Sequence, residues 1–160
     1  IYLIGECYDD IASSEYLANY HNISASPAPH FDMDQELILQ KTILSLIENK
    51  HIKSAHDISD GGLYVCLIES GIVRNLGFDI FTNHDFRQDA YLFGESQSRV
   101  VVTVSPNKKD KFEKYLKDKI SFTSLGEVTE SKIIIDDLDF GSINSVKDDY
   151  LNAIESILKS

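Results

Sequence analysis

Residues 55–62 of the chain read AHDISDGG and place an imidazole and two carboxylates next to paired glycines. The apolar run LYVCLI follows, so we expect a strand to end near His56 and a helix to begin at about Asp60. Asp57 would then lie at the carboxyl end of a strand, where open α/β sheets bind ligands, and could hold a hard cation such as Mg²⁺. The helix start would offer unpaired N–H groups to an anion. The candidate phosphate- or nucleotide-binding residues are therefore His56, Asp60, Gly61 and Gly62, with Asp57 as the candidate metal ligand.

A second polar segment, GESQSR, lies directly before the apolar run VVVTV. Glu95, Ser96 and Gln97 could together hydrogen-bond a sugar or an amide. Arg99 could pair with a phosphate through two parallel hydrogen bonds. These four residues form the candidate substrate-binding set.

Each of these segments also has a purely structural interpretation. Ser59 or Asp60 could only cap a helix, and the glycines could only permit tight packing. The GESQSR segment could be a solvated turn with an ordinary ion pair. Asp9 and Asp10 could ligate a cation, but capping of the following helix is favoured. The sequence contains neither a nucleophile elbow nor a Gly-rich phosphate loop, and no two histidines have the spacing of a metal site on a helix face.

The charge balance restricts the classes of partner. The 160 residues include 15 Lys plus Arg against 26 Asp plus Glu, a net charge of −11, which argues against binding to nucleic acid or to anionic membranes. Phosphates would have to be handled locally, through a metal ion, glycine amides or a few cations. We expect Cys7 and Cys66 to be free thiols in a reducing cytosol, with one disulfide as the alternative. With neither a signal peptide nor a membrane-spanning run, a cytoplasmic location is expected.

The order of predicted elements indicates an α+β fold. From residue 52 onward the chain follows the order β-α-β-β-α-β, the split βαβ arrangement of ferredoxin-like folds, so we expect helices packed on a mixed sheet. One domain is expected over residues 1–160, and its start without Met inside an apolar run suggests a piece of a longer chain. Strands are expected at residues 1–4, 52–56, 77–82, 100–104, 122–128 and 132–136, and helices at 13–21, 60–72, 146–158 and from 105 onward.

The clearest helix begins after Asp32, with Gln35 at the spacing of a capping box. Apolar residues follow at spacings of mostly three and four, which predicts one broad buried face. The members of this predicted face are Leu37, Leu39, Ile43, Leu44, Leu46 and Ile47.

Taken together, the motifs resemble those of a known family. SAHDISDGGL, LFGESQSRVVVTV and SLGEVTE occur in that order, with LIGE near the start. They resemble the carboxyl-terminal domain of the synthetase subunit of phosphoribosylformylglycinamidine synthase, within the aminoimidazole ribonucleotide (AIR) synthetase-like superfamily. The resemblance implies a three-layer α/β/α sandwich with partial ferredoxin-like topology.

The resemblance also implies an activity. The full synthetase is a ligase of purine biosynthesis that uses ATP and Mg²⁺ to convert formylglycinamide ribonucleotide into the amidine. The ammonia comes from glutamine through a glutaminase subunit, with a small accessory subunit. In the first half of such enzymes the position of Asp57 binds Mg²⁺, and those of Glu95, Ser96 and Gln97 contact the ribonucleotide. This chain resembles the second half, which often forms a structural or auxiliary nucleotide site, and the family's catalytic lysine and histidine lie in other domains. We therefore expect no catalytic residue here and an inactive isolated fragment; a nucleotide–Mg²⁺ binding module or a scaffold domain is the alternative.

Overall fold

The computed structural model describes residues 1–159 and contains two four-stranded sheets, with the orders β2-β4-β1-β5 and β6-β3-β7-β8. In the first sheet every neighbouring pair is antiparallel. In the second, β3 and β7 are parallel and the other pairs are antiparallel. The strands are β1 (Tyr2–Ile4), β2 (Ser54–Asp57), β3 (Gly77–Ile80), β4 (Val100–Thr103), β5 (Phe122–Ser124), β6 (Gly126–Thr129), β7 (Lys132–Ile135) and β8 (Leu138–Ser142).

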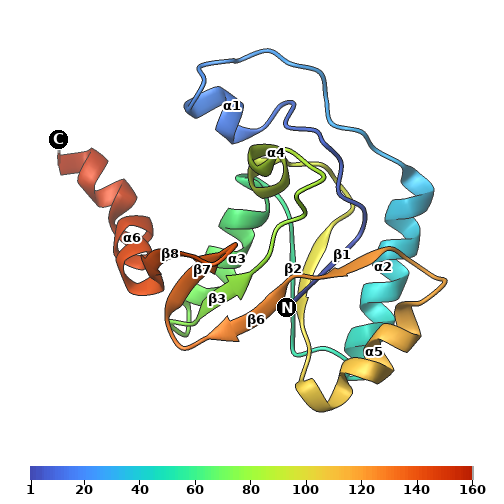
Figure 1. Cartoon of the computed structure of the whole chain (residues 1–160). Helices are drawn as coiled ribbons and strands as arrows, with labels where there is room; N and C mark the ends of the chain where they lie inside the picture. Colours follow the sequence, from blue (N-terminus) through green and yellow to red (C-terminus); the bar gives the residue numbers. More distant parts are fainter. Residues whose placement is uncertain (160) are drawn as a thin grey trace.

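Helices cover both faces of the first sheet (Figure 1). On one face α2 (Met33–Glu48) and α5 (Lys109–Leu116) pack against β1 and β4, with the short 3₁₀ turn Pro106–Lys108 leading into α5. On the other face α3 (Gly62–Ile72) lies between the first sheet and β3 of the second sheet. The last helix, α6 (Ile143–Lys159), contacts α3 and then extends away from the body of the molecule (Figure 1).

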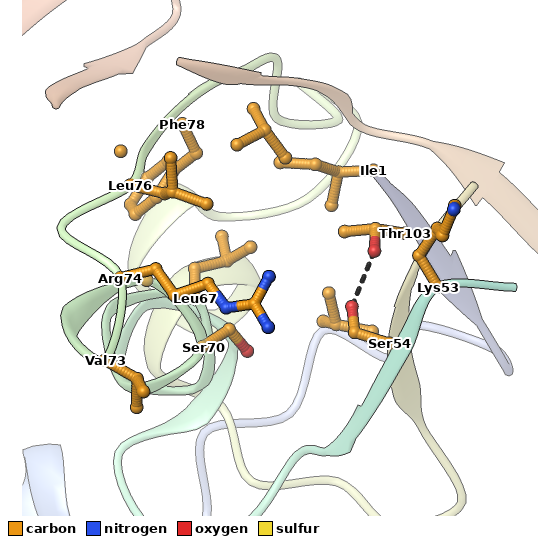
Figure 2. A pocket seen from close by; sticks show the side chains of 14 residues that line it. Ile1, Lys53, Ser54, Leu67, Ser70, Val73, Arg74, Leu76, Phe78 and Thr103 are labelled. Atoms are coloured by element: carbon orange, nitrogen blue, oxygen red, sulfur yellow. Dashed lines mark hydrogen bonds between the residues drawn. The ribbon is translucent and has the colours of Figure 1, made fainter. Parts of the chain in front are cut away.

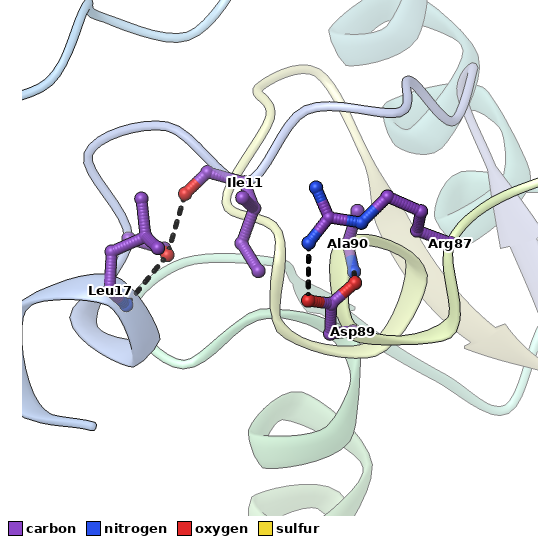
Figure 3. Close-up of polar contacts among 6 residues, drawn as sticks. Ile11, Leu17, Arg87, Asp89 and Ala90 are labelled. Carbon is purple, nitrogen blue, oxygen red and sulfur yellow. Dashed lines mark hydrogen bonds and ion pairs between the residues drawn. The ribbon is translucent and has the colours of Figure 1, made fainter. Parts of the chain in front are cut away.

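Two short helices, α1 (Glu15–Asn19) and α4 (Gln88–Phe93), lie side by side near one end of the molecule (Figure 1). The ring of Tyr16 stacks on that of Phe93, with 4.8 Å between the ring centroids. Figure 3 shows Asp89, in the first turn of α4, accepting the backbone N–H of the next residue. The two helices flank the segment that carries the GESQSR motif.

The α+β class is therefore confirmed, and helices lie on both sides of the first sheet. The predicted order β-α-β-β-α-β is interrupted by α4, which lies between β3 and β4. Its strands also divide between two sheets, because β3 joins the second sheet instead of pairing with β4. The predicted strand 122–128 likewise splits at Leu125 into β5 and β6. A Cβ on Gly126 would lie 1.9 Å from the carbonyl oxygen of Asp79, so the backbones approach too closely there for any other residue.

The predicted buried face of α2 is wrong in part. Leu39 and Leu46 are buried against the sheet, as expected. Leu37, Leu44 and Ile47 are 47%, 57% and 53% exposed. The sheet covers only one stripe of the helix, and no described element covers the other.

Other local expectations are confirmed or differ by a few residues. Asp32 does cap α2, accepting the N–H groups of Asp34 and Gln35 at 2.9 and 3.0 Å. The cap of α1 is Ser14 instead of Asp9 or Asp10. The helix α4 and the strand β8 were not predicted, because each is only five or six residues long and shows no clear periodicity. Both cysteines are free, and no helix within residues 1–159 is long and apolar enough to cross a bilayer.

Candidate functional site

The pairing of β2 with β4 brings the two sequence motifs together. Asp57, the last residue of β2, lies opposite Val100, the first residue of β4. The N–H of Ile58 then donates to the carbonyl oxygen of Arg99 at 3.0 Å, which extends the pairing by one residue. The segment 57–62 and the segment 94–99 therefore meet at one end of the sheet, although about 40 residues separate them in the sequence.

These segments border a hollow of about 630 Å³. Asp57 and Asp60 line it from the end of β2, and Glu95 and Gln97 line it from the segment before β4. The hollow is completed by α2 and by the long connection that precedes it. The remaining lining residues are Ser13, Pro29, Phe31, Glu36, Leu39, Ile58, Ser59, Ser98, Arg99 and Val100.

The charged groups of the hollow are mostly carboxylates. Glu36, Asp57, Asp60 and Glu95 are its acidic lining residues, and Arg99 is the lining residue with a positive charge. A lining of this kind repels a free phosphate and attracts a cation or a cation–phosphate complex. Within residues 1–159 no three His, Cys, Asp or Glu side chains are close enough to form a metal site by themselves. A Mg²⁺ ion would fit only with part of its oxygen ligands supplied by a bound phosphate and water, which is how this ion is usually held.

Arg99 does not face the hollow as a phosphate ligand. It is 3% exposed, and its guanidinium donates to the carbonyl oxygens of Ser96 at 2.9 Å and Gly94 at 2.6 Å. Burial lowers the pKa of Arg99, and the neighbouring Cys7 opposes that shift. The expectation that Arg99 binds substrate is therefore corrected: the side chain fixes the shape of the segment from inside. Ser96, which is 2% exposed and does not line the hollow, is equally unsuited to contact a ligand there.

Glu95 also has internal partners. Its Oε1 atom accepts the backbone N–H of Gly61 at 2.8 Å and that of Glu15 at 2.8 Å. The carboxylate thus holds the start of α3 and the start of α1 together. Glu95 lines the hollow as predicted, but part of its hydrogen-bonding capacity is used within the protein.

The paired glycines have a structural function. The N–H of Gly61 is taken by Glu95, and the N–H of Gly62 donates to the carbonyl oxygen of Ser59 at 3.0 Å. Both residues have positive φ, and a Cβ on Gly62 would lie 2.8 Å from the backbone of the segment before β4. The phosphate-binding prediction for these two amides is therefore corrected in favour of tight packing.

His56 lies on the opposite face of β2 from Asp57, because neighbouring strand residues point to opposite sides. Its Nδ1 atom is 2.9 Å from the hydroxyl of Ser70, and its Nε2 atom is 3.4 Å from a carboxylate oxygen of Glu69. His56 therefore interacts with α3 and is not part of the hollow, which corrects its predicted nucleotide role. The alternation along β2 would have indicated this from the sequence.

Sequence reasoning missed the contribution of α2 to the hollow. The hydroxyl of Ser98 donates to Oε2 of Glu36 at 2.6 Å and so ties the GESQSR segment to the first turn of α2. Glu36 occurs in a helical first turn, where an acidic residue is common, and nothing in the local pattern distinguishes it. Asp57, Asp60 and Gln97 are thus the predicted residues that remain exposed to the hollow.

The fold and the hollow define an α+β domain with an acidic cavity where two antiparallel strands meet. The chain belongs to the family described as AIR synthase related protein, C-terminal domain, whose model matches residues 1–137.

Relatives with known names agree with this family. The chain is 37% identical over 134 residues to "Phosphoribosylformylglycinamidine synthase subunit PurL" of Alkaliphilus metalliredigens, covering 83% of this chain and 18% of that protein. The protein of the same name from Salinibacter ruber is 48% identical over 95 residues, covering 59% of this chain and 13% of that protein. The chain thus spans less than a fifth of the length of each of these two relatives.

Solved structures share the fold. The structure "T. maritima PurL complexed with FGAR" superposes with a TM-score of 0.75 at 18% identity, over 91% of this chain and 27% of that chain. A thiamine-monophosphate kinase from Stenotrophomonas maltophilia K279a superposes with a TM-score of 0.55 at 16% identity, over 84% of this chain and 49% of that chain.

Proposed function

We propose that this chain is the carboxyl-terminal domain of the synthetase subunit of a phosphoribosylformylglycinamidine synthase and acts within a longer polypeptide. The subunit would be a cytoplasmic ATP-dependent ligase of purine biosynthesis, converting formylglycinamide ribonucleotide and ammonia into the amidine. The ammonia would come from glutamine through a glutaminase subunit, assisted by a small accessory subunit. The family match and the names of relatives that cover more than four-fifths of the chain support this proposal.

The observation that carries the proposal is the shared hollow at the end of β2, which Asp57, Asp60 and Gln97 line with exposed side chains. Asp57 and Asp60 would hold Mg²⁺ together with phosphate oxygens of a bound nucleotide. Such an ion neutralises phosphate charge when bound, which an acidic lining cannot do. The amide of Gln97 would hydrogen-bond a ribose or an amide group of the ligand.

The domain would supply one wall of a cleft and no catalytic residue. Arg99, the cationic side chain of the hollow, is directed to backbone carbonyls. Holding a nucleotide requires only carboxylates, a metal ion and a few hydrogen bonds, whereas phosphoryl transfer also requires both substrates in line. We therefore expect the remaining domains of the subunit to provide the reacting groups.

A scaffold function is the second candidate, and the contacts of Glu95 favour it. Its Oε1 atom binds the N–H groups of Gly61 and Glu15, so part of the motif that looks suited to a ligand is used inside the domain. A domain of this kind would only shape and support its neighbours.

The two candidates are separated by Asp57→Asn in the full-length subunit with its partner subunits. Asp57 is exposed, so the substitution should leave the melting temperature unchanged. If Asp57 holds Mg²⁺ and nucleotide, ATP-dependent amidine formation or binding of Mg²⁺–ADP falls at least about tenfold, because one charge-assisted ligand is lost. Asp118→Asn is the matched control: Asp118 is exposed outside the hollow, and Asn tolerates its φ of 64°.

Wild-type activity and nucleotide affinity in Asp57→Asn would overturn the binding function and leave the scaffold function. Gln97→Ala, on the other segment of the hollow, gives an independent test. Robust amidine formation by the isolated 160 residues would contradict the proposed division of labour between domains.

A further inference from the structure

A second cavity of about 340 Å³ lies between β2, the C-terminal end of α3 and the second sheet (Figure 2). This cavity shares no lining residue with the acidic hollow. Ser54, at the start of β2, lines the cavity, whereas Asp57, at the end of the same strand, lines the hollow. Its walls are largely apolar. The buried side chains of Leu67, Phe78 and Val101 form part of them.

The charged side chains that line this cavity are both cations, Lys53 and Arg74. Figure 2 shows the guanidinium of Arg74 reaching from the end of α3 across the cavity toward Ser54 and Thr103. Within residues 1–159 neither cationic side chain that lines the cavity makes an ion pair. The cavity is therefore locally positive in a chain whose net charge is −11.

The arginines elsewhere in the chain have partners. Arg87 pairs with Asp89 at 2.6 Å, and Arg99 donates to backbone carbonyls. Arg74 has neither kind of contact within the described residues, although its backbone N–H donates to the carbonyl oxygen of Gly71 at 3.1 Å. A cation at the C-terminal end of α3 also interacts favourably with the helix dipole. That interaction does not require the guanidinium to extend across an apolar cavity.

The hydroxyl groups around the cavity are already paired. Those of Ser54 and Thr103 lie 2.6 Å apart, and that of Ser70 lies 2.9 Å from Nδ1 of His56. The side-chain donors that remain for a ligand in the cavity are therefore those of Arg74, because the ammonium of Lys53 points away from the cavity (Figure 2). A planar guanidinium matches a carboxylate through two parallel hydrogen bonds.

We propose that this cavity is a second binding site, which takes a small monocarboxylate carried on an apolar body. The carboxylate would pair with Arg74, and the apolar part would lie against Leu67 and Phe78. A volume of about 340 Å³ falls in the range of small-molecule sites. A monoanion is favoured over a phosphate dianion, because the guanidinium of Arg74 reaches into the cavity whereas the ammonium of Lys53 points away from it (Figure 2), and the lining hydroxyl groups are already paired. This site is independent of the function proposed for the acidic hollow.

Benzoate is a suitable probe, and benzamide is its neutral counterpart of similar shape. In a titration of the ¹⁵N-labelled chain followed by NMR, benzoate should shift the backbone amides of Ser70, Arg74 and Thr103 saturably. Benzamide should bind at least about tenfold more weakly, because it cannot form the charged pair. Arg74→Gln should weaken benzoate to a similar degree, and Arg74→Lys should fall between.

The control for the loss of one positive charge is Arg87→Gln, which lies outside the cavity and should leave benzoate affinity unchanged. Melting temperatures report whether each variant is folded; Arg74 is exposed and its replacement should not unfold the chain. The proposal is overturned if folded Arg74→Gln binds benzoate as the wild type does. Equal affinity for benzamide, or shifts that map to the acidic hollow, would overturn it as well.

Discussion

Replacing Glu95 with alanine removes the carboxylate that joins the starts of α1 and α3. The Oε1 atom of Glu95 accepts the N–H groups of Glu15 and Gly61, each at 2.8 Å. Gly61 is the N-cap residue of α3 and has no side chain that could cap the helix. Glu95 therefore accepts, from a distant segment, the N-cap N–H that a Glu or Gln three residues into the helix accepts in a capping box.

The size of the effect follows from the exposure of the two donors. A hydrogen bond to a charged group contributes about 1.5–3 kcal/mol to stability, and less where water competes. The N–H of Gly61 is partly buried and that of Glu15 is exposed, so we expect Glu95→Ala to lose about 2–4 kcal/mol in all. Urea unfolding at pH 7 measures this loss, and amide exchange at Gly61 should accelerate. Glu130→Ala, an exposed glutamate in a turn, should change stability by less than about 0.5 kcal/mol.

The reasoning is refuted if Glu95→Ala unfolds within about 0.5 kcal/mol of the wild type and Gly61 exchanges no faster. The carboxylate would then have no structural function, and a ligand in the hollow would be its better explanation. The stability of Glu95→Gln should lie between those of Glu95→Ala and the wild type, because the amide oxygen of Gln can still accept both N–H groups without the charge.

Four further substitutions test other parts of the structure, and urea unfolding measures each. Arg99→Met leaves buried carbonyls without a donor and should cost about 2–4 kcal/mol. Leu46→Ala should cost about 2–5 kcal/mol, whereas Leu44→Ala on the exposed stripe should cost less than about 0.5 kcal/mol. Burial raises the pKa of Asp136, but hydrogen bonds from Thr82 outweigh it and lower the pKa overall. Wild-type stability should therefore fall as pH drops below about 4, and Asp136→Asn should flatten that decline.

Much of the fold follows from local pattern. The apolar run after Gly62 predicted α3, and the run VVVTV, which consists of β-branched residues, predicted β4. The division of strands between two sheets could not be predicted, since it depends on which distant strand β3 pairs with. The close approach at Gly126, where the chain passes from one sheet to the other, gives no sign beyond a single glycine.

The candidate site was predicted in position but not in detail. Asp57, Glu95 and Gln97 do line one hollow, as the two motifs and the family resemblance implied. The sequence did not indicate the directions of His56 and Arg99, because residue type indicates what a side chain can bind and not where it points. For His56 the strand alternation contained the answer, whereas the burial of Arg99 depends on the fold of the segment around it.

The exposed stripe of α2 shows that an apolar pattern can predict a helix without predicting which of its residues are buried. Leu37, Leu44 and Ile47 belong to the apolar pattern that predicted a buried face, yet about half of each side chain is exposed. Helical periodicity reports that a face is apolar, but it contains no information about which surface covers that face. In this chain the first sheet covers the stripe of Leu39 and Leu46 and leaves the other stripe in contact with solvent. The apolar pattern of α2 is wider than the sheet can cover. The pattern therefore predicts the helix correctly but predicts its burial only in part.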